Sequence, residues 1–134
     1  MKSFKVGTFN LRNLVLPNHR YYGNDVYSDE EYQKKKDWTR SQLDKMDAEI
    51  IGFQEVFHKA ALEDVLNGTP LAGNVIVLGE TGQSPTVGLA SSFSLVSPPE
   101  SVENIPAEIL DIFLALPAEY AKFSRPVLKA KLAL

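Results

Sequence analysis

Two short phrases of the sequence end runs of strand-forming residues with polar side chains suited to phosphate chemistry. They are Thr8-Phe9-Asn10-Leu11-Arg12 and Phe53-Gln54-Glu55-Val56. Open α/β sheets present functional groups at the carboxyl ends of their strands, so Asn10 and Glu55 are expected to meet there. Mg²⁺ prefers oxygen donors and few protein carboxylates. We therefore predict that Asn10 and Glu55 could hold Mg²⁺, with Mn²⁺ as the alternative ion, against a phosphate.

Each of the two residues also has a structural interpretation. An unpaired carboxylate beside a buried strand is costly, so Glu55 would then pair with a lysine or arginine at the sheet edge. Asn10 is equally suited to starting a turn through a hydrogen bond to its own backbone. Position alone does not separate these alternatives.

Four further residues are candidates for contacting a phosphate-ester substrate. Arg12 could fork onto a phosphate. His19 and Arg20 lie in a basic and aromatic loop that could stack on a base or clamp a phosphate. His58 opens an expected helix shortly after Glu55. The alternatives are a solvated arginine, an exposed irregular loop and a solvated histidine at a helix start.

The elements expected to position these residues form a strand–helix–strand unit. A strand is predicted over 4–10, a helix over 29–46 and a second strand over 49–54. The helix begins with a capping box, because Ser28 and Glu31 have the required types and spacing. Trp38 is expected to pack under this helix, and the lysines at 34–36 are expected to form a solvated face. The second strand is apolar on both faces, so both are expected to be covered.

The rest of the chain predicts a mixed sheet, and hence an α/β protein of α+β type. Its expected elements are a helix over 58–66, a hairpin of strands over 74–78 and 87–93, a proline-rich loop over 97–103, a helix over 105–116 and a strand over 126–134.

Composition restricts the classes of function. The 134 residues predict one domain, 1–134, and the 0 cysteines exclude disulfides, zinc–thiolate sites and thiol catalysis. The net charge of -3 argues against a dedicated duplex-binding module. No apolar leader and no run of about 18 apolar residues is seen, so we expect no membrane span and a cytoplasmic location.

The same two phrases carry a resemblance to a known family. Phe9-Asn10-Leu11-Arg12 and Ile51-Gly52-Phe53-Gln54-Glu55-Val56 resemble the endonuclease/exonuclease/phosphatase superfamily, which includes DNase I-like nucleases. The stretches 87–95 and 123–128 look like the next two strands of that family. The resemblance implies that Glu55 is the metal-binding glutamate and Asn10 the active-site asparagine. It departs from some members at Arg12, where they have an aspartate, and at Thr86-Val87-Gly88, where they have a carboxylate.

The resemblance also implies a fold and a limit. The family fold is a four-layer α/β/β/α sandwich, of which this chain would supply mainly the amino-terminal sheet with its helices. The family's catalytic histidine region, its Asp-x-Asn motif and its final Asp-His pair have no counterpart here. The chain is therefore expected to be a truncated, amino-terminal portion that is inactive alone. It is also expected to self-associate as an oligomer through an exposed sheet face.

The function that this resemblance implies is that of a Mg²⁺-dependent phosphoesterase or phosphodiesterase, a nuclease-like hydrolase. Metal-activated water would attack phosphorus in line. The alternative is a non-catalytic assembly or interaction module derived from the same fold. A nucleic-acid-binding domain without catalysis is a third class. The substrate stays open among DNA, RNA, a lipid head group, a phosphoinositide and a nucleotide.

Overall fold

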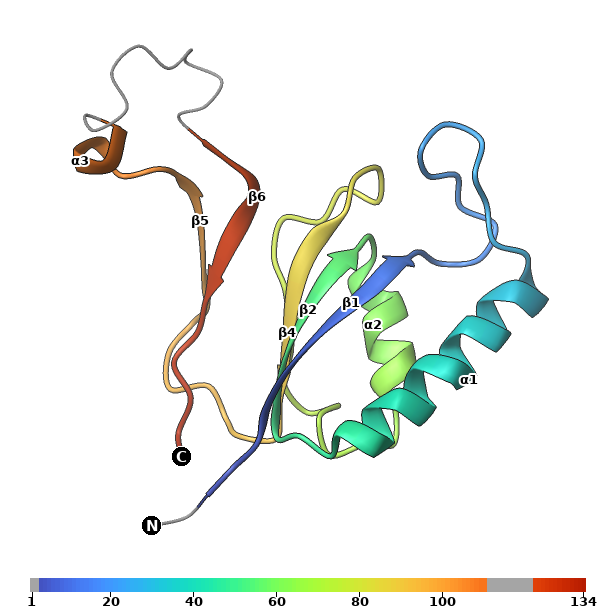
Figure 1. Cartoon of the computed structure of the whole chain (residues 1–134), viewed down its shortest axis with the longest axis horizontal. Helices are drawn as coiled ribbons and strands as arrows, with labels where there is room; N and C mark the ends of the chain where they lie inside the picture. Colours follow the sequence, from blue (N-terminus) through green and yellow to red (C-terminus); the bar gives the residue numbers. More distant parts are fainter. Residues whose placement is uncertain (1–2, 111–121) are drawn as a thin grey trace.

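The computed structural model describes residues 3–110 and 122–134. Along the chain the elements are β1 (Val6–Leu14), α1 (Asp29–Met46), β2 (Ile50–Val56), α2 (Lys59–Leu66), β3 (Val75–Val77), β4 (Thr86–Ser91), β5 (Glu100–Asn104), α3 (Ala107–Leu110) and β6 (Lys122–Lys129) (Figure 1). They form a four-stranded sheet in the order β1-β2-β4-β3 and a two-stranded sheet of β5 and β6. Strands β1 and β2 are parallel, whereas β4 runs antiparallel to β2 and β3. The expected α/β class with a mixed sheet is confirmed.

The strand–helix–strand unit forms as its sequence predicts. Ser28 caps α1, because its Oγ accepts a hydrogen bond from the Glu31 amide at 3.1 Å. The Glu31 carboxylate in turn accepts from the Ser28 amide at 2.9 Å, so the capping box is complete. The helix connects β1 to β2, and the two strands pair in parallel with Asn10 opposite Gln54.

Strand β1 extends further than the predicted range of 4–10. It continues to Leu14 through an irregularity in which Arg12 and Asn13 adopt left-handed backbone angles, with φ of 48° and 63°. The pairing register shifts between Asn10 and Leu14, and Leu14 then pairs with Val56. Strand β2 likewise runs to Val56 instead of ending at residue 54.

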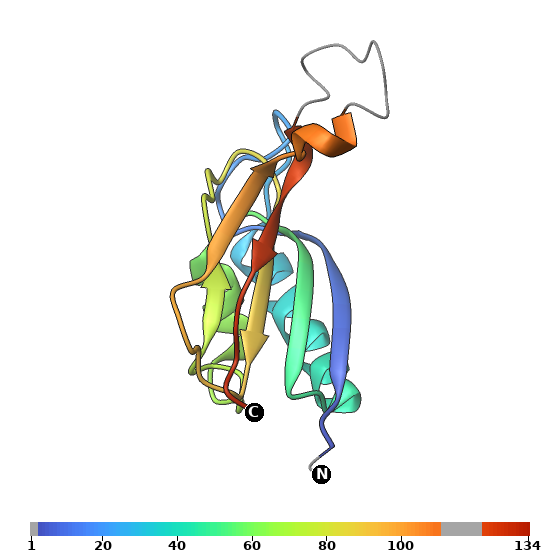
Figure 2. The ribbon, with the colours of Figure 1, turned by 90° about the vertical axis from the view of Figure 1, so that its left-hand side faces the viewer.

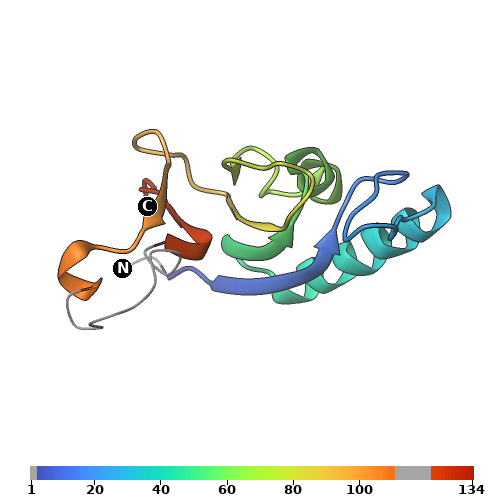
Figure 3. The same ribbon diagram turned by 90° about the horizontal axis from the view of Figure 1, so that it is seen from above.

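Helices α1 and α2 cover one side of the four-stranded sheet, whereas β5 and β6 lie on the other side (Figures 1 and 3). The core between helices and sheet consists mainly of aliphatic and aromatic side chains, including Leu11, Leu14, Ile51, Phe53, Val56, Leu62, Val65 and Leu66. Strand β6 lies against β4, and β1 and β2 are left uncovered by the hairpin (Figure 2). The expectation that both faces of the second strand are covered holds on one face of β2, where Ile51 and Phe53 are buried, and only in part on the other, where Ile50 and Gln54 are half-buried. In the neighbouring strand β1, Val6 is 66% exposed.

Trp38 does not pack under α1 as predicted, since it is 59% exposed. The buried face of the helix carries Tyr32, Thr39 and Leu43 instead. The indole lies beside Phe9 of the edge strand β1, with 6.2 Å between ring centroids. Because β1 is the edge strand of the sheet, no further strand lies beyond Phe9 to cover the indole, which faces solvent.

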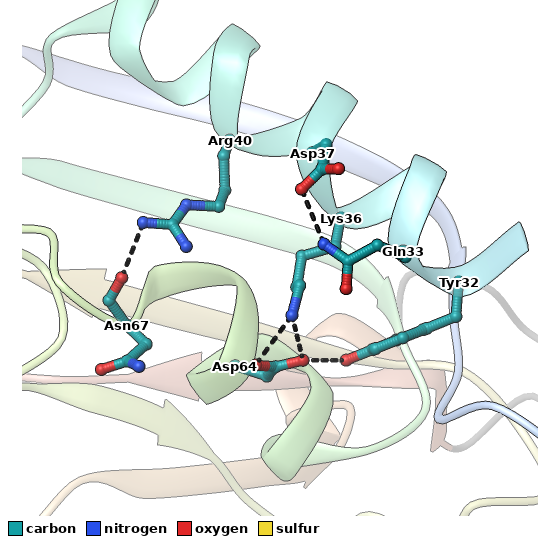
Figure 4. Close-up of polar contacts among 7 residues, drawn as sticks. All are labelled: Tyr32, Gln33, Lys36, Asp37, Arg40, Asp64 and Asn67. Carbon is teal, nitrogen blue, oxygen red and sulfur yellow. Dashed lines mark hydrogen bonds and ion pairs between the residues drawn. The ribbon is translucent and has the colours of Figure 1, made fainter. Parts of the chain in front are cut away.

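A polar network joins the two helices (Figure 4). The Asp64 carboxylate of α2 accepts hydrogen bonds from the Tyr32 hydroxyl at 2.8 Å and from Lys36 Nζ at 3.2 Å. Burial and this bond to Asp64 raise the pKa of the Tyr32 hydroxyl. Arg40 donates to the carbonyl of Asn67, just beyond the end of α2, at 2.9 Å. The network thus links α1 to α2 and its end through Tyr32, Lys36 and Arg40.

We expect Asp64→Ala to lower the free energy of unfolding by roughly 1–3 kcal/mol, because it leaves a largely buried ammonium without its counter-ion. The Lys36 side chain is 17% exposed in this pair. The matched control is Asp37→Ala, since among the described residues Asp37 accepts a single bond, from Gln33 on the outer surface of α1. Denaturant unfolding measures both variants. Equal losses in the two variants would show that the network contributes nothing particular to helix packing.

The remaining boundaries were predicted unevenly. Helix α2 and the β3–β4 hairpin match the ranges 58–66, 74–78 and 87–93, with shorter strands. The predicted loop over 97–103 is wrong, because β5 pairs there with β6 and Val102 stands opposite Val127. The predicted strand over 126–134 lies at 122–129 instead. Of the predicted helix over 105–116, Ala107–Leu110 is helical and residues 111–116 lie outside the described residues.

Across residues 3–110 and 122–134, no helix combines the length and apolarity that a membrane crossing requires.

Candidate metal and phosphate site at the ends of β1 and β2

The structure brings Asn10 and Glu55 together where β1 and β2 end. Asn10 Nδ2 donates to Glu55 Oε1 at 3.1 Å, and the Asn13 amide donates to Glu55 Oε2 at 3.0 Å. Asn10 Oδ1 accepts from the Arg12 amide at 2.9 Å, which is the turn-forming bond that was the alternative interpretation of this residue. Asn10 thus serves the local turn and the carboxylate at once.

Three residues of this site have left-handed backbone angles. Besides Arg12 and Asn13, Glu55 has φ of 61°, although none of them is glycine. Such angles cost of order 1–3 kcal/mol each and persist only where surrounding contacts hold them. Here the contacts are the hydrogen bonds to Glu55 and Asn10. Backbone strain of this kind clusters at functional sites.

Lys35 of α1 also belongs to the site, although the sequence analysis placed it on a solvated face. Its Nζ donates to the Arg12 carbonyl at 2.8 Å and lies 5.5 Å from the centroid of the Tyr27 ring. Burial is the main cause that lowers the pKa of the Lys35 ammonium; Arg12 lowers it further and Glu55 opposes the change. A signal was present, because Lys35 lies three residues after Tyr32 and four before Thr39, on the buried side of the helix.

Arg12 is held by its backbone, and its side chain is exposed. The Arg12 amide donates to Asn10 Oδ1 and the Arg12 carbonyl accepts from Lys35 Nζ. The contacts that form the turn thus involve the backbone of Arg12 and not its guanidinium. The exposed side chain agrees with both interpretations of Arg12, a solvated arginine and a ligand contact, so its contact with a phosphate stays a prediction.

The loop over 17–27 lies at the same end of the sheet as the arrowheads of β1 and β2 (Figure 1). Aromatic contacts order it: Tyr21 stacks on Tyr27 with 5.3 Å between centroids and meets the buried Phe57 edge-on. Arg20 and His19 are exposed on this loop.

His58 is half-buried and its ring has a structural partner. His58 Nδ1 accepts a hydrogen bond from the Leu16 amide at 3.2 Å, and the His19 ring lies 5.0 Å away between centroids. It occupies the cap position of α2 without a side-chain cap bond. Burial, followed by the charge of His19, lowers the pKa of His58, whereas Glu80 opposes the change. The structure thus ties His58 to the loop backbone and does not give it a contact with Glu55.

This lowered pKa predicts a pH dependence of stability. A histidine whose folded-state pKa lies below its unfolded value near 6.5 binds protons more readily when unfolded, so stability is lost as pH falls through that window. We expect the free energy of unfolding to drop between about pH 7.5 and about pH 5, and the drop to be smaller in His58→Gln. Denaturant unfolding at both pH values measures this. His19→Gln is the comparison variant and should reduce the drop less than His58→Gln does, because the charge of His19 is the smaller of the two causes that lower the pKa of His58. A drop unchanged in His58→Gln would assign the effect to other groups.

The donor set suits a small divalent cation of the Mg²⁺ type. Glu55 supplies one carboxylate, each of whose oxygens has one internal donor and hence a further lone pair. The buried Oδ1 of Asn13 has no hydrogen-bond partner among the described residues, so the site contains an oxygen that a water or cation would satisfy. Mg²⁺ is usually held by one or two carboxylates together with waters and substrate phosphates. Within the described residues, no group of three or more histidine and acidic side chains forms a complete metal cage.

Comparisons of the chain with protein-family models, with curated proteins and with solved structures found no match.

Proposed function

We propose that the ends of β1 and β2 form part of the active site of a Mg²⁺-dependent phosphoesterase or phosphodiesterase. The observation that supports it most is the carboxylate of Glu55, oriented by Asn10 and by the Asn13 amide on a strained backbone. The resemblance of the two sequence phrases to the endonuclease/exonuclease/phosphatase superfamily points the same way. The substrate is a phosphate ester, with nucleic acid among the candidates.

In this proposal the residues of the chain have separate tasks. Glu55 would hold the cation, and Asn13 Oδ1 is a second oxygen available to it or to a water. Asn10 fixes the rotamer of Glu55 through Nδ2 and would help to place a phosphate oxygen or the attacking water. Arg12 would fork onto the phosphate from the exposed side. A bound Mg²⁺ would polarise the phosphoryl oxygen and lower the pKa of a coordinated water.

Hydrolysis also needs help for the leaving group and a base for water, and neither task is assigned to a residue described here. We therefore propose that this chain is the amino-terminal portion of such an enzyme and is nearly inactive alone. We place the enzyme in the cytoplasm as part of the same proposal, because a chain with 0 cysteines needs no oxidising compartment.

Calorimetric titration of the chain with Mg²⁺ and with Mn²⁺ tests the proposal. We expect one weak site, and a midpoint of thermal unfolding that rises with cation concentration, because a ligand that binds only the folded state stabilises it. A phosphodiester chromogenic substrate with the tighter cation tests turnover, which we expect to be barely detectable. The absence of both a heat of binding and a shift of the unfolding midpoint would contradict the proposal.

A second candidate function is assembly, and a specific surface favours it. An open groove of about 490 Å³ lies between Leu89 of β4 and the hairpin of β5 and β6. Its walls include Val102, Phe123 and Val127, which are 38%, 39% and 47% exposed. A two-stranded sheet is marginally stable by itself, and an exposed apolar surface of this kind marks an interaction site.

The occupant we infer for this groove is a second copy of the chain. Strand β5 carries Glu100 and Glu103, whereas β6 carries three basic residues, Lys122, Arg125 and Lys129. In a twofold arrangement with the two hairpins face to face, the acidic strand of one copy would lie over the basic strand of the other. Within one copy Glu100 already pairs with Lys129 at 3.8 Å, so the two copies would exchange this pair across the interface.

We expect Val127→Asp to shift the chain from dimer to monomer, because the charge would have to be buried in the apolar interface. Sedimentation velocity over a concentration series measures it. The matched control is Val26→Asp, since Val26 is 48% exposed, close to the 47% of Val127, but lies in the loop over 17–27. A wild-type chain that stays monomeric at every concentration would contradict assembly through this face.

A further inference from the structure

The three consecutive lysines of α1 have three different environments. Lys34 Nζ forms an exposed ion pair with Glu30 at 2.8 Å, and Lys36 Nζ pairs with Asp64 at 3.2 Å. Lys35 is half-buried, and in the part of the chain that the structure describes no carboxylate lies within 4.0 Å of its Nζ. The middle lysine is thus a cation withdrawn from water without an ion-pair partner.

The hydrogen bonds of Lys35 are also incomplete. An ammonium has three donors, and the structure assigns one of them, to the Arg12 carbonyl. The aromatic face of Tyr27 contributes a weaker attraction at 5.5 Å. Two donors of the ammonium therefore have no partner among the described residues.

The charges around Lys35 favour an anion. Arg12 is close enough to disfavour the charged form of Lys35, and Glu55 is the carboxylate that favours it. If a divalent cation occupies Glu55, the site holds two positive side chains beside a metal and has an excess of positive charge. A phosphate ester, with several acceptor oxygens and negative charge, would relieve this excess and use the free donors.

We propose that Lys35 is a phosphate-binding residue of this site, donating to a non-bridging oxygen of a phosphate ester whose other side faces Glu55, with Arg12 as the second cation. This inference rests on the proposed function, since it places the phosphate against the cation held by Glu55. It assigns the ligand class as a phosphate group, whichever molecule carries it. It also gives the lysine run of α1 a role that its sequence did not indicate.

A linkage experiment separates this role from a structural one. If Lys35 binds phosphate, inorganic phosphate should tighten Mg²⁺ binding to the wild-type chain about fivefold or more, since coupling between bound ligands is reciprocal. Lys35→Gln should abolish that gain. It should leave Mg²⁺ binding in the absence of phosphate unchanged or tighter, because a repelling charge has been removed. Lys35→Arg should restore the phosphate effect.

The matched control is Lys34→Gln, which removes the same charge from the adjacent position and should keep the full phosphate effect. A phosphate effect that survives in Lys35→Gln overturns the inference. So does a loss of Mg²⁺ affinity without phosphate that Lys35→Arg does not restore, because Lys35 would then only support the turn around Arg12.

A second measurement tests phosphate binding by Lys35 even if the chain proves to bind no Mg²⁺. If the wild-type chain binds no Mg²⁺, phosphate binding is measured alone from the broadening of the phosphorus NMR signal of inorganic phosphate. Broadening that Lys35→Gln removes and Lys34→Gln keeps would retain the phosphate site while the metal site is abandoned. Equal broadening in both variants, or none in the wild type, overturns the inference.

Discussion

Replacing Glu55 by glutamine is expected to weaken binding of Mg²⁺ and Mn²⁺ by about 100-fold or more, because the variant loses the one carboxylate of the donor set. The substitution keeps the shape of the side chain, and its amide oxygen still accepts a hydrogen bond from the Asn13 amide, as Glu55 Oε2 does at 3.0 Å. The fold should therefore persist while the cation is lost. Calorimetric titration with each ion measures the affinity.

The control for this experiment is Glu63→Gln. Glu63 is an exposed glutamate of α2 whose pair with Lys59 has an N···O distance of 3.7 Å, and its loss should change neither affinity nor stability. Circular dichroism at matched concentrations checks that Glu55→Gln is folded. Cation binding that is undiminished in a folded Glu55→Gln variant would assign Glu55 the structural role and remove the basis of the proposed function.

The second large effect is expected in the core below the site. Phe53 of β2 is 0% exposed, and Phe53→Ala should lower the free energy of unfolding by about 3–5 kcal/mol, through lost burial and the cavity that it leaves. Domains of this size have a total stability of roughly 5–15 kcal/mol, so the variant should be close to unfolding. Urea unfolding followed by far-ultraviolet circular dichroism measures the loss.

The comparison variant is Val6→Ala in the neighbouring strand β1. Val6 is 66% exposed, so its truncation should change stability by less than about 0.5 kcal/mol. A Phe53→Ala variant that loses no more than Val6→Ala would mean that β2 is not the centre of the core. The measurement also bears on the site, because Phe53 lies two residues before Glu55 on the same strand.

Helix α1 could be predicted from sequence because its signals are local. Its capping box and acidic first turn lie within four residues, and its predicted bounds match the structure. The meeting of Asn10 and Glu55 could be predicted as well, because two parallel strands bring their carboxyl ends to one edge. Both inferences needed only the types and spacing of a few residues and a general rule of sheet geometry.

The turn over 10–13 and the position of Lys35 could not be predicted in the same way. No glycine indicates the left-handed angles at Arg12 and Asn13. The hydrogen bond that holds the Asn13 amide is accepted by Glu55, 42 residues away in the sequence. The orientation of Lys35 depends on how α1 lies over β1 and β2. The prediction that Trp38 is packed is wrong for the same reason, because its exposure depends on the position of β1 at the edge of the sheet.

The proline-rich stretch over 97–103 shows a different limit. Its residues have little strand propensity, and β5 forms only because β6 pairs with it, as at Val102 and Val127. Tertiary pairing overrides local preference in such a segment. An element that is stabilised by interactions among its own residues can therefore be predicted from sequence more reliably than one that forms only by pairing with a distant strand.

The left-handed backbone at Glu55 implies that two selections applied to this position would give different answers. Glycine, and after it asparagine, fits φ of 61° with the least strain. A library randomised at residue 55 and sorted for heat resistance should therefore enrich glycine and asparagine. The same library sorted for cation retention should keep glutamate or aspartate. How far the two populations diverge would measure the stability that this position gives up for its chemistry.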